Sequence, residues 1–154
     1  MTLPASGAIT MAQIATELGI SQTGLSLNDS RVRTLAGISS GAISFNSLHG
    51  KANLNATGNS ATGSASSINA GGTVSCQPSV TASGTGTITY SWSFTSNANS
   101  CTLANASNAA CIVAHTFTKN TSGSATAVLQ CVVSNGSATQ TVSAQANLSW
   151  NSGQ

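Results

Sequence analysis

The spacing of apolar residues predicts short helices in the first third of the chain. Thr10 is a suitable N-cap, because its hydroxyl can accept the free backbone N–H groups of a first helical turn. Gly19 can end a helix in the left-handed conformation. Between these two residues, apolar side chains recur at helical spacing and predict a helix over 11–18: Met11, Ile14, Ala15 and Leu18.

A second helix is predicted between a cap at Asn28 or Asp29 and a stop at Gly37, and its apolar face consists of Val32, Leu35 and Ala36. A third, very short turn covers 45–49 and follows the candidate cap Ser44. Three helices this short bury little apolar surface, and domains below about 40 residues usually need staples or partners. We therefore expect this segment to dock on another surface.

After residue 51 the pattern changes to the period of two that marks half-buried strands. In the clearest case, four large residues share one face of a strand: Ile88, Tyr90, Trp92 and Phe94. Other strands are predicted before residue 70 and at 73–80, 111–117, 125–133 and 139–150. The Asn-Gly pair between the last two is a strong hairpin signal.

Short strands separated by Gly, Ser and Asn turns predict a β-sandwich. The order Cys76, Trp92, Cys131 matches an immunoglobulin core, in which the Trp packs on an inter-sheet disulfide. Leu129 replaces the Tyr expected two residues before the second Cys, so we describe the domain as immunoglobulin-like, with Tyr90, Trp92 and Leu129 in its core. The predicted class is mainly β, with a docking segment of short helices and extended pieces at 1–51, a linker at 52–57, a sandwich at 58–150 and a tail at 151–154.

The four cysteines allow three pairings. The immunoglobulin order favours Cys76 with Cys131, which leaves Cys101 with Cys111 as a clasp on one loop. A zinc site is the alternative, but the sequence contains no Cys-x-x-Cys spacing. Free thiols would persist in a reducing cytoplasm.

Charge is concentrated in the first third of the chain. Only six residues are Asp, Glu, Lys or Arg, and Lys119 is the only one after residue 51. The formal net charge of +2 is too small to attract a polyanion, so we expect no nucleic-acid partner. No apolar run approaches the roughly 20 residues of a membrane span, and Met1 to Ile20 lacks the basic region of a signal peptide, so we expect no membrane partner.

Side chains suited to catalysis are scarce, so we expect neither an enzyme nor a cofactor or metal site. The sandwich contains no Asp or Glu, which excludes hydrolysis by paired carboxylates within it. His49 and His115 have no Cys, Asp or Glu at a suggestive spacing. Core packing explains Tyr90 and Trp92, whereas Trp150 is a more open aromatic that could cover a sandwich edge or contact a ligand.

Two stretches of the first segment repeat each other: Ser6-Gly7-Ala8-Ile9-Thr10 and Ser40-Gly41-Ala42-Ile43-Ser44. Three further stretches occur in order with them: Leu25-Ser26-Leu27-Asn28-Asp29, Leu35-Ala36-Gly37 and His49-Gly50-Lys51. The set resembles an N-terminal segment that recurs in tailed-bacteriophage virion proteins, many of them tail or fibre components. The resemblance implies a virion location and an attachment role for this segment, with apolar docking candidates Ile9, Met11, Ile14, Leu18, Leu25, Leu27, Val32, Leu35, Ile43 and Phe45.

The leading hypothesis is a non-enzymatic virion structural protein whose N-terminal segment docks an immunoglobulin-like module onto a tail, fibre or head. Its partners would be other virion proteins, and analogy with phage fibres implies a homo-oligomer, such as a trimer. Two alternatives are a capsid decoration protein and an adhesin that binds host-surface glycan through Trp150. A third is a helix-turn-helix regulator with Gly19 in its turn, although only Arg31 and Arg33 are available there for phosphates.

Overall fold

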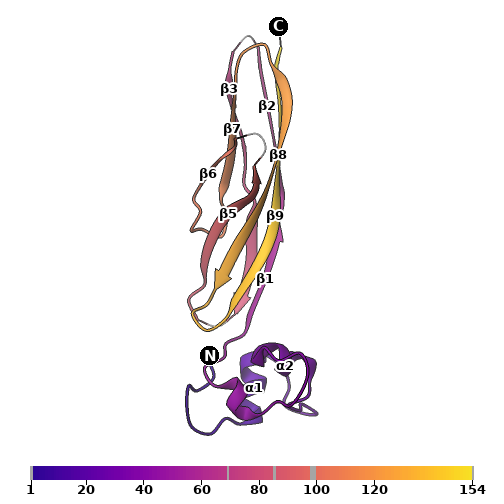
Figure 1. The fold of residues 1–154 in the computed structure, drawn as a ribbon, viewed down its shortest axis with the longest axis vertical. Helices are drawn as coiled ribbons and strands as arrows, with labels where there is room; N and C mark the ends of the chain where they lie inside the picture. Colours follow the sequence, from indigo (N-terminus) through magenta and orange to yellow (C-terminus); the bar gives the residue numbers. More distant parts are fainter. Residues whose placement is uncertain (1, 69, 85, 98–99, 154) are drawn as a thin grey trace. The chain divides into compact units, whose positions relative to one another are not determined.

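The computed structural model describes residues 2–68, 70–84, 86–97 and 100–153, and the chain forms two compact units. The first unit contains Met1–Asn55 together with Ser83–Ile88 and Ser134–Thr139. The second unit contains Ala56–Ala82, Thr89–Val133 and Gln140–Gln154. The helices belong to the first unit, and the strands lie mainly in the second (Figure 1).

Helix α1, Met11–Leu18, begins and ends at residues that suit those positions. The Thr10 hydroxyl accepts the backbone N–H of Gln13, and the Gln13 side chain accepts the backbone N–H of Thr10 at 2.8 Å, which closes a capping box. Gly19 ends the helix with a φ of 66°, where a residue without Cβ is unstrained. These bounds match the range that the apolar spacing indicated.

Helix α2, Ser30–Ala36, has Asp29 as its N-cap. The Asp29 carboxylate accepts the backbone N–H of Arg31 at 2.9 Å. Gly37 ends the helix in the left-handed conformation. The helix therefore uses the second of the two predicted caps.

The third helical element is the 3₁₀ helix η1, Phe45–Leu48. Ser44 precedes it in an extended conformation but makes no capping hydrogen bond. The Ser44 hydroxyl lies 3.4 Å from Ser47 Oγ instead, so the predicted cap at Ser44 is wrong.

The first unit has a hydrophobic core of its own, which the sequence prediction did not foresee. Three of its residues, Leu3, Ile9 and Leu48, lie outside α1 and α2. The opening residues run beside the end of the segment, since Leu3 N–H donates to Lys51 O and Gly50 N–H donates to Pro4 O, each at 3.0 Å. The buried core comprises Leu3, Ile9, Ile14, Val32, Leu35, Ala36 and Leu48.

The predicted linker at 52–57 is not a linker. Ala52 is buried, and both the backbone N–H and the backbone carbonyl of Asn53 make hydrogen bonds to side chains. Its N–H donates to Glu17 Oε1 at 2.8 Å, and its carbonyl accepts from Asn135 Nδ2 at 3.1 Å. Strand β1, Leu54–Asn59, begins immediately afterwards. The sequence did not indicate this strand, because its inward and outward residues are mostly small and differ little in hydrophobicity.

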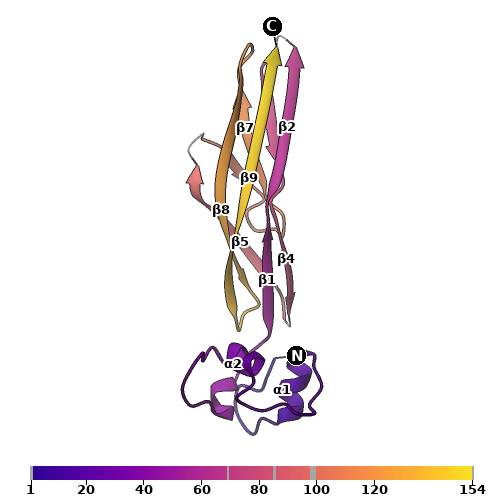
Figure 2. The same ribbon diagram turned by 90° about the vertical axis from the view of Figure 1, so that its right-hand side faces the viewer.

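The strands are arranged in three groups (Figures 1 and 2). The four-stranded sheet has the order β2 (Ala61–Ile68), β9 (Thr139–Gly153), β8 (Ser122–Ser134) and β5 (Thr89–Asn97). The three-stranded sheet has the order β3 (Gly72–Cys76), β7 (Ile112–Phe117) and β6 (Thr102–Ala104). β1 pairs with β4 (Ser79–Gly84), while β2 runs parallel to β9, so the first two strands join different sheets.

This arrangement confirms the predicted immunoglobulin-like sandwich. In an immunoglobulin domain the Trp strand and the second Cys strand are neighbours in one sheet, and the first Cys strand lies in the other. Here β5 with Trp92 lies beside β8 with Cys131, and β3 with Cys76 belongs to the three-stranded sheet. Trp92 and Leu129 are buried in this core, whereas Tyr90 is only half-buried.

Two strand boundaries differ from the prediction. The single strand expected at 73–80 is divided into β3 and β4 by Pro78, which has no backbone N–H for a sheet ladder. The expected tail at 151–154 is part of β9 as far as Gly153, and Asn151 pairs with Ser66 of β2. Ser152 is buried and its N–H donates to Thr121 O at 2.8 Å, so these residues have ladder and turn partners.

Two glycines let the first strands approach the rest of the sandwich closely. A Cβ added to Gly63 in β2 would overlap the carbonyl oxygen of Ser75 in β3. A Cβ added to Gly58 in β1 would overlap the carbonyl oxygen of Ser143 in β9. Only glycine fits at these two positions unless the backbone moves.

Across the described residues, no helix is both long enough and apolar enough to cross a bilayer. The longest helix, α1, has 8 residues, and a span needs about 20.

Candidate functional site

The predicted docking residues of the first unit fall into three groups. Ile9, Ile14, Val32 and Leu35 are buried in the core, so they cannot contact a partner in this conformation. Five are half-buried against that core: Met11, Leu18, Leu25, Leu27 and Ile43. Phe45 is 37 % exposed. Among the described residues, it is the one large hydrophobic side chain that is exposed.

The sequence repeat in this unit is also a structural repeat. Gly7 and Gly41 adopt left-handed φ values of 90° and 86°. Thr10 and Ser44, three residues after each glycine, are both extended and precede α1 and η1 respectively. The same backbone device therefore introduces two helical elements, although only the first has a side-chain cap.

Both arginines of the first unit are engaged by the protein itself. The Arg31 side chain donates to both carboxylate oxygens of Asp29, at 2.9 and 2.8 Å. Arg33 donates to Asn28 Oδ1 and to the carbonyls of Ile38 and Gly41. The Arg31 side chain, followed by its backbone N–H, lowers the pKa of Asp29 to about 2.

These contacts correct the helix-turn-helix interpretation. That motif joins its helices by a turn of about 3–4 residues, whereas here the chain from Gly19 to Asp29 separates α1 from α2. Gly24 in this connection has a φ of 76° and cannot continue a helix, so no second helix follows Gly19 at the spacing of the motif. Arg31 and Arg33, which the motif would need for contacts with DNA phosphates, are hydrogen-bonded within the first unit.

All four cysteines are buried free thiols, so the structure contains neither predicted disulfide. Cys101 precedes Thr102, which pairs with Ala114, whereas Cys111 lies at the other end of the β6–β7 pair. A separation of four strand residues is about 13 Å, and a disulfide needs Cα atoms within about 7 Å. The proposed clasp between Cys101 and Cys111 is therefore geometrically excluded.

Cys76 and Cys131 do lie in different sheets, but both are free thiols. Cys131 Sγ lies 3.8 Å from the carbonyl oxygen of Val132 in its own strand. Desolvation raises the pKa of every thiol, and that of Cys111 is raised to about 11. Buried thiols of high pKa are poor nucleophiles and poor metal ligands.

Trp150 does not form the open aromatic platform that the sequence suggested. It packs against two side chains of β7, with its ring centroid 4.5 Å from that of His115 and 6.1 Å from that of Phe117. Trp92 is buried and its Nε1 donates to Asn108 O at 2.9 Å. In the first unit, His49 Nδ1 lies 3.0 Å from Pro4 O. Within the described part of the chain, no group of three His, Cys, Asp or Glu could hold a metal ion.

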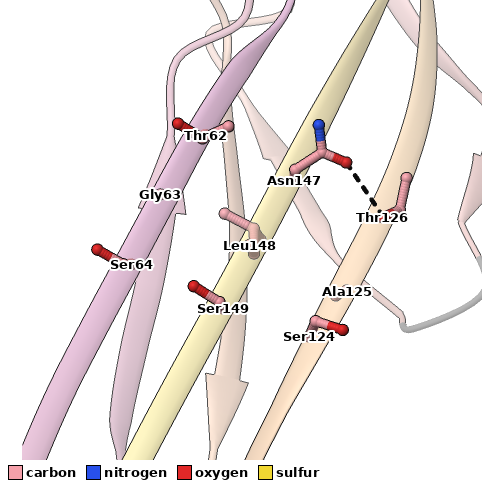
Figure 3. Close-up of a pocket in the computed structure, with 9 residues that line it drawn as sticks. All are labelled: Thr62, Gly63, Ser64, Ser124, Ala125, Thr126, Asn147, Leu148 and Ser149. Atoms are coloured by element: carbon pink, nitrogen blue, oxygen red, sulfur yellow. Dashed lines mark hydrogen bonds between the residues drawn. The ribbon is translucent and has the colours of Figure 1, made fainter.

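The second unit has a groove of about 480 Å³ on the outer face of the four-stranded sheet (Figure 3). Six outward side chains from three strands line it: Thr62 and Ser64 of β2, Asn147 and Ser149 of β9, and Ser124 and Thr126 of β8. Between them, Gly63, Ala125 and Leu148 form the floor. We define these nine residues as the hydroxyl groove.

Sequence reasoning missed the hydroxyl groove, although the alternation contained a signal. In the groove segments 62–64, 124–126 and 147–149, the outward positions are Ser, Thr and Asn, and the inward positions are Gly, Ala and Leu. Strand pairing brings Thr62 opposite Asn147 and Ser64 opposite Ser149, which the sequence alone does not reveal. A parallel pairing between the second and the last strand is needed to assemble the groove.

The order of the strands defines the class of the second unit, an immunoglobulin-like β-sandwich. No family model and no curated protein matches the chain. Among solved structures, the M1 domain from titin is similar at 12% identity and a TM-score of 0.31, over 65% of this chain and 98% of that domain. A three-Ig titin structure is similar at 19% identity and a TM-score of 0.25, over 64% of this chain and 32% of its own length.

Proposed function

We propose that this chain is a non-enzymatic structural component of a phage virion, in which the first unit attaches to another virion protein and the second unit is displayed. The observation that carries the proposal is the repeated Ser-Gly-Ala-Ile device. Its two copies share a backbone conformation at Gly7 and Gly41, and they belong to the stretches that resemble the N-terminal segment of tail and fibre proteins.

The exposed Phe45 supports an attachment role for this unit. It lies at the start of η1, directly after the second copy of the device. An aromatic side chain buries a large apolar area when a partner covers it, so it suits a contact residue. Ile43 is half-buried two residues earlier, which extends the apolar contact.

The proposal is tested first by mass spectrometry of purified virions of the phage that encodes the chain. We expect the protein to co-purify with virions in a density gradient, and its absence from them would overturn the proposal. Gold labelling of a tagged chain then separates the two locations: label at the tail supports attachment to a tail or fibre, and label over the head supports the capsid-decoration alternative.

A variant tests the attachment surface. Phe45→Ser should reduce incorporation into virions severalfold, because it removes the exposed ring without disturbing the buried core. Asn46→Ser, at the next exposed position of η1, is the matched control and should be incorporated normally. Equal incorporation of both variants would show that Phe45 is not part of the contact.

A further inference from the structure

We propose that the hydroxyl groove binds a neutral, polyhydroxylated saccharide. This inference does not rest on the virion role, since it concerns only the outer face of the second unit. It also differs from the adhesin alternative raised by the sequence, because that alternative depended on Trp150, which packs against His115 and Phe117.

The groove offers hydrogen-bonding groups that are free to meet a ligand. Within the described residues, the hydroxyls of Thr62, Ser64, Ser124 and Ser149 make no hydrogen bond to the protein, and all four side chains are exposed. Each hydroxyl can donate one hydrogen bond and accept two. A saccharide hydroxyl has the same capacity, so either partner can act as donor or acceptor at every contact.

One amide in the groove is fixed by a neighbour. Thr126 Oγ1 donates to Asn147 Oδ1 at 3.2 Å (Figure 3). This bond orients the half-buried Asn147 side chain and leaves the two N–H groups of Nδ2 as donors. A fixed amide loses less entropy on binding than a free side chain would.

The lining groups form a regular grid rather than a single row. Thr62, Asn147 and Thr126 make one line across the three strands, and Ser64, Ser149 and Ser124 make the next (Figure 3). Strands are spaced about 4.8 Å apart and alternate residues of a strand about 7 Å apart. A two-dimensional array of polar contacts suits a ring that carries a hydroxyl on most of its carbons.

Charge and floor chemistry narrow the ligand class. None of the nine groove residues is charged, and Lys119 is the only Asp, Glu, Lys or Arg between residues 52 and 154. An acidic or phosphorylated ligand would therefore be desolvated without a counter-charge. The floor adds no charge, because Gly63, Ala125 and Leu148 are apolar, and Ala125 and Leu148 are buried beneath the lining side chains.

The test follows backbone amide shifts of the full chain by NMR during titration with neutral homo-oligosaccharides of glucose, galactose, mannose and N-acetylglucosamine, and with an oligomer of galacturonic acid. We expect at least one neutral oligomer to shift amides of 62–64, 124–126 and 147–149 with millimolar affinity, and the acidic oligomer to be without effect. The proposal is overturned by an absence of shifts with all four neutral oligomers, or by equal binding of the acidic one.

Matched double variants locate the site. Ser64→Ala with Ser149→Ala should weaken binding at least tenfold, because it removes two hydroxyls of one line while leaving the fold intact. Ser91→Ala with Ser93→Ala, on the outer face of β5 beyond the groove, should bind like the unaltered chain. Unchanged affinity in the first pair would overturn the proposal. So would groove shifts that follow protein concentration instead of saccharide, since these would show a second copy of the chain on this face.

Discussion

In the first unit, side chains and left-handed glycines fix the ends of α1 and α2, whereas in the second unit small side chains allow long strands to approach one another. The first unit contains five of the six charged residues of the chain, and Asp29, Arg31 and Arg33 use theirs to hold loops and caps. The second relies on glycines at close backbone contacts and on a buried core rich in alanine and cysteine. A methyl group added at a left-handed glycine of the first unit should cost backbone strain, whereas one added at a close contact of the second unit should cost steric overlap.

The largest expected effect breaks the close packing of the second unit. In Gly63→Ala the new Cβ would overlap the Ser75 carbonyl oxygen, so the backbone of β2 or β3 must move. We expect a loss of about 3 kcal/mol in the free energy of unfolding, at the upper end of the range for overpacking. Urea unfolding followed by tryptophan fluorescence measures this loss, because Trp92 and Trp150 both lie in the second unit.

Gly153→Ala is the matched control. A Cβ at Gly153 meets no atom within 4 Å, and the residue lies in the same sheet as β2. Its midpoint in urea should stay close to that of the unaltered chain. Equal destabilisation by the two substitutions would show that Gly63 matters for its flexibility and not for close packing.

Alkaline pH should weaken the second unit through its thiols. The Cys111 pKa is raised from 9.0 to about 11, mainly by desolvation. Below pH 9 both the folded and the unfolded chain keep this thiol protonated, so its contribution is fully present. Between about pH 9 and 11 only the unfolded chain ionises it, and up to about 2 kcal/mol of stability is lost.

This loss is measured as the urea midpoint between pH 8 and 11, with Cys111→Ala as the comparison. The variant is less stable at pH 8 because of its cavity, but its midpoint should fall less steeply as the pH rises. Parallel curves for the two proteins would contradict the expected role of Cys111. Quantifying thiols with a chromogenic reagent provides a second check, with little reaction in the native chain and four thiols released in denaturant.

Two kinds of local signal made parts of the fold predictable from sequence: residue types that are restricted to helix ends, and a strong alternation of apolar and polar residues. Thr10, Asp29 and Gly37 identify helix ends because caps have a restricted chemistry, and the apolar alternation around Trp92 identifies a strand and its inward face. The first strand was placed too late because Leu54 to Asn59 alternates between small residues, which give little contrast.

The candidate sites depended on partners that are distant in sequence. The core of the first unit needs Leu3 and Leu48, which no helical pattern identifies. The hydroxyl groove needs the pairing of β2 with β9, about 85 residues apart in sequence. Cysteine order suggested a disulfide, but the direction of each thiol depends on the packing of both sheets.

A moderate effect is expected at the first helix. Thr10→Ala removes the hydroxyl that accepts the Gln13 N–H, so α1 loses its capping box. We expect a loss of about 1 kcal/mol, observed as faster amide hydrogen exchange at Gln13 and through α1. Thr16→Ala is the control, since the Thr16 hydroxyl bonds back to Ala12 O within the helix and its removal should be neutral. Similar acceleration of amide exchange in both variants would show that the Thr10 cap does not stabilise the N-terminus of α1.

The smallest expected effect lies at the exposed end of α2 and has the opposite pH dependence to the thiols. The Arg31 side chain and backbone N–H hold the pKa of Asp29 near 2, below its ordinary value of 3.8. The carboxylate therefore stabilises the folded first unit fully above about pH 4, and this contribution is lost as the pH falls toward 2. Amide exchange of α2 should accelerate over that range, and Asp29→Asn should remove the pH dependence while keeping a side-chain acceptor at the cap. If acceleration persists in that variant, a group other than Asp29 controls the acid response.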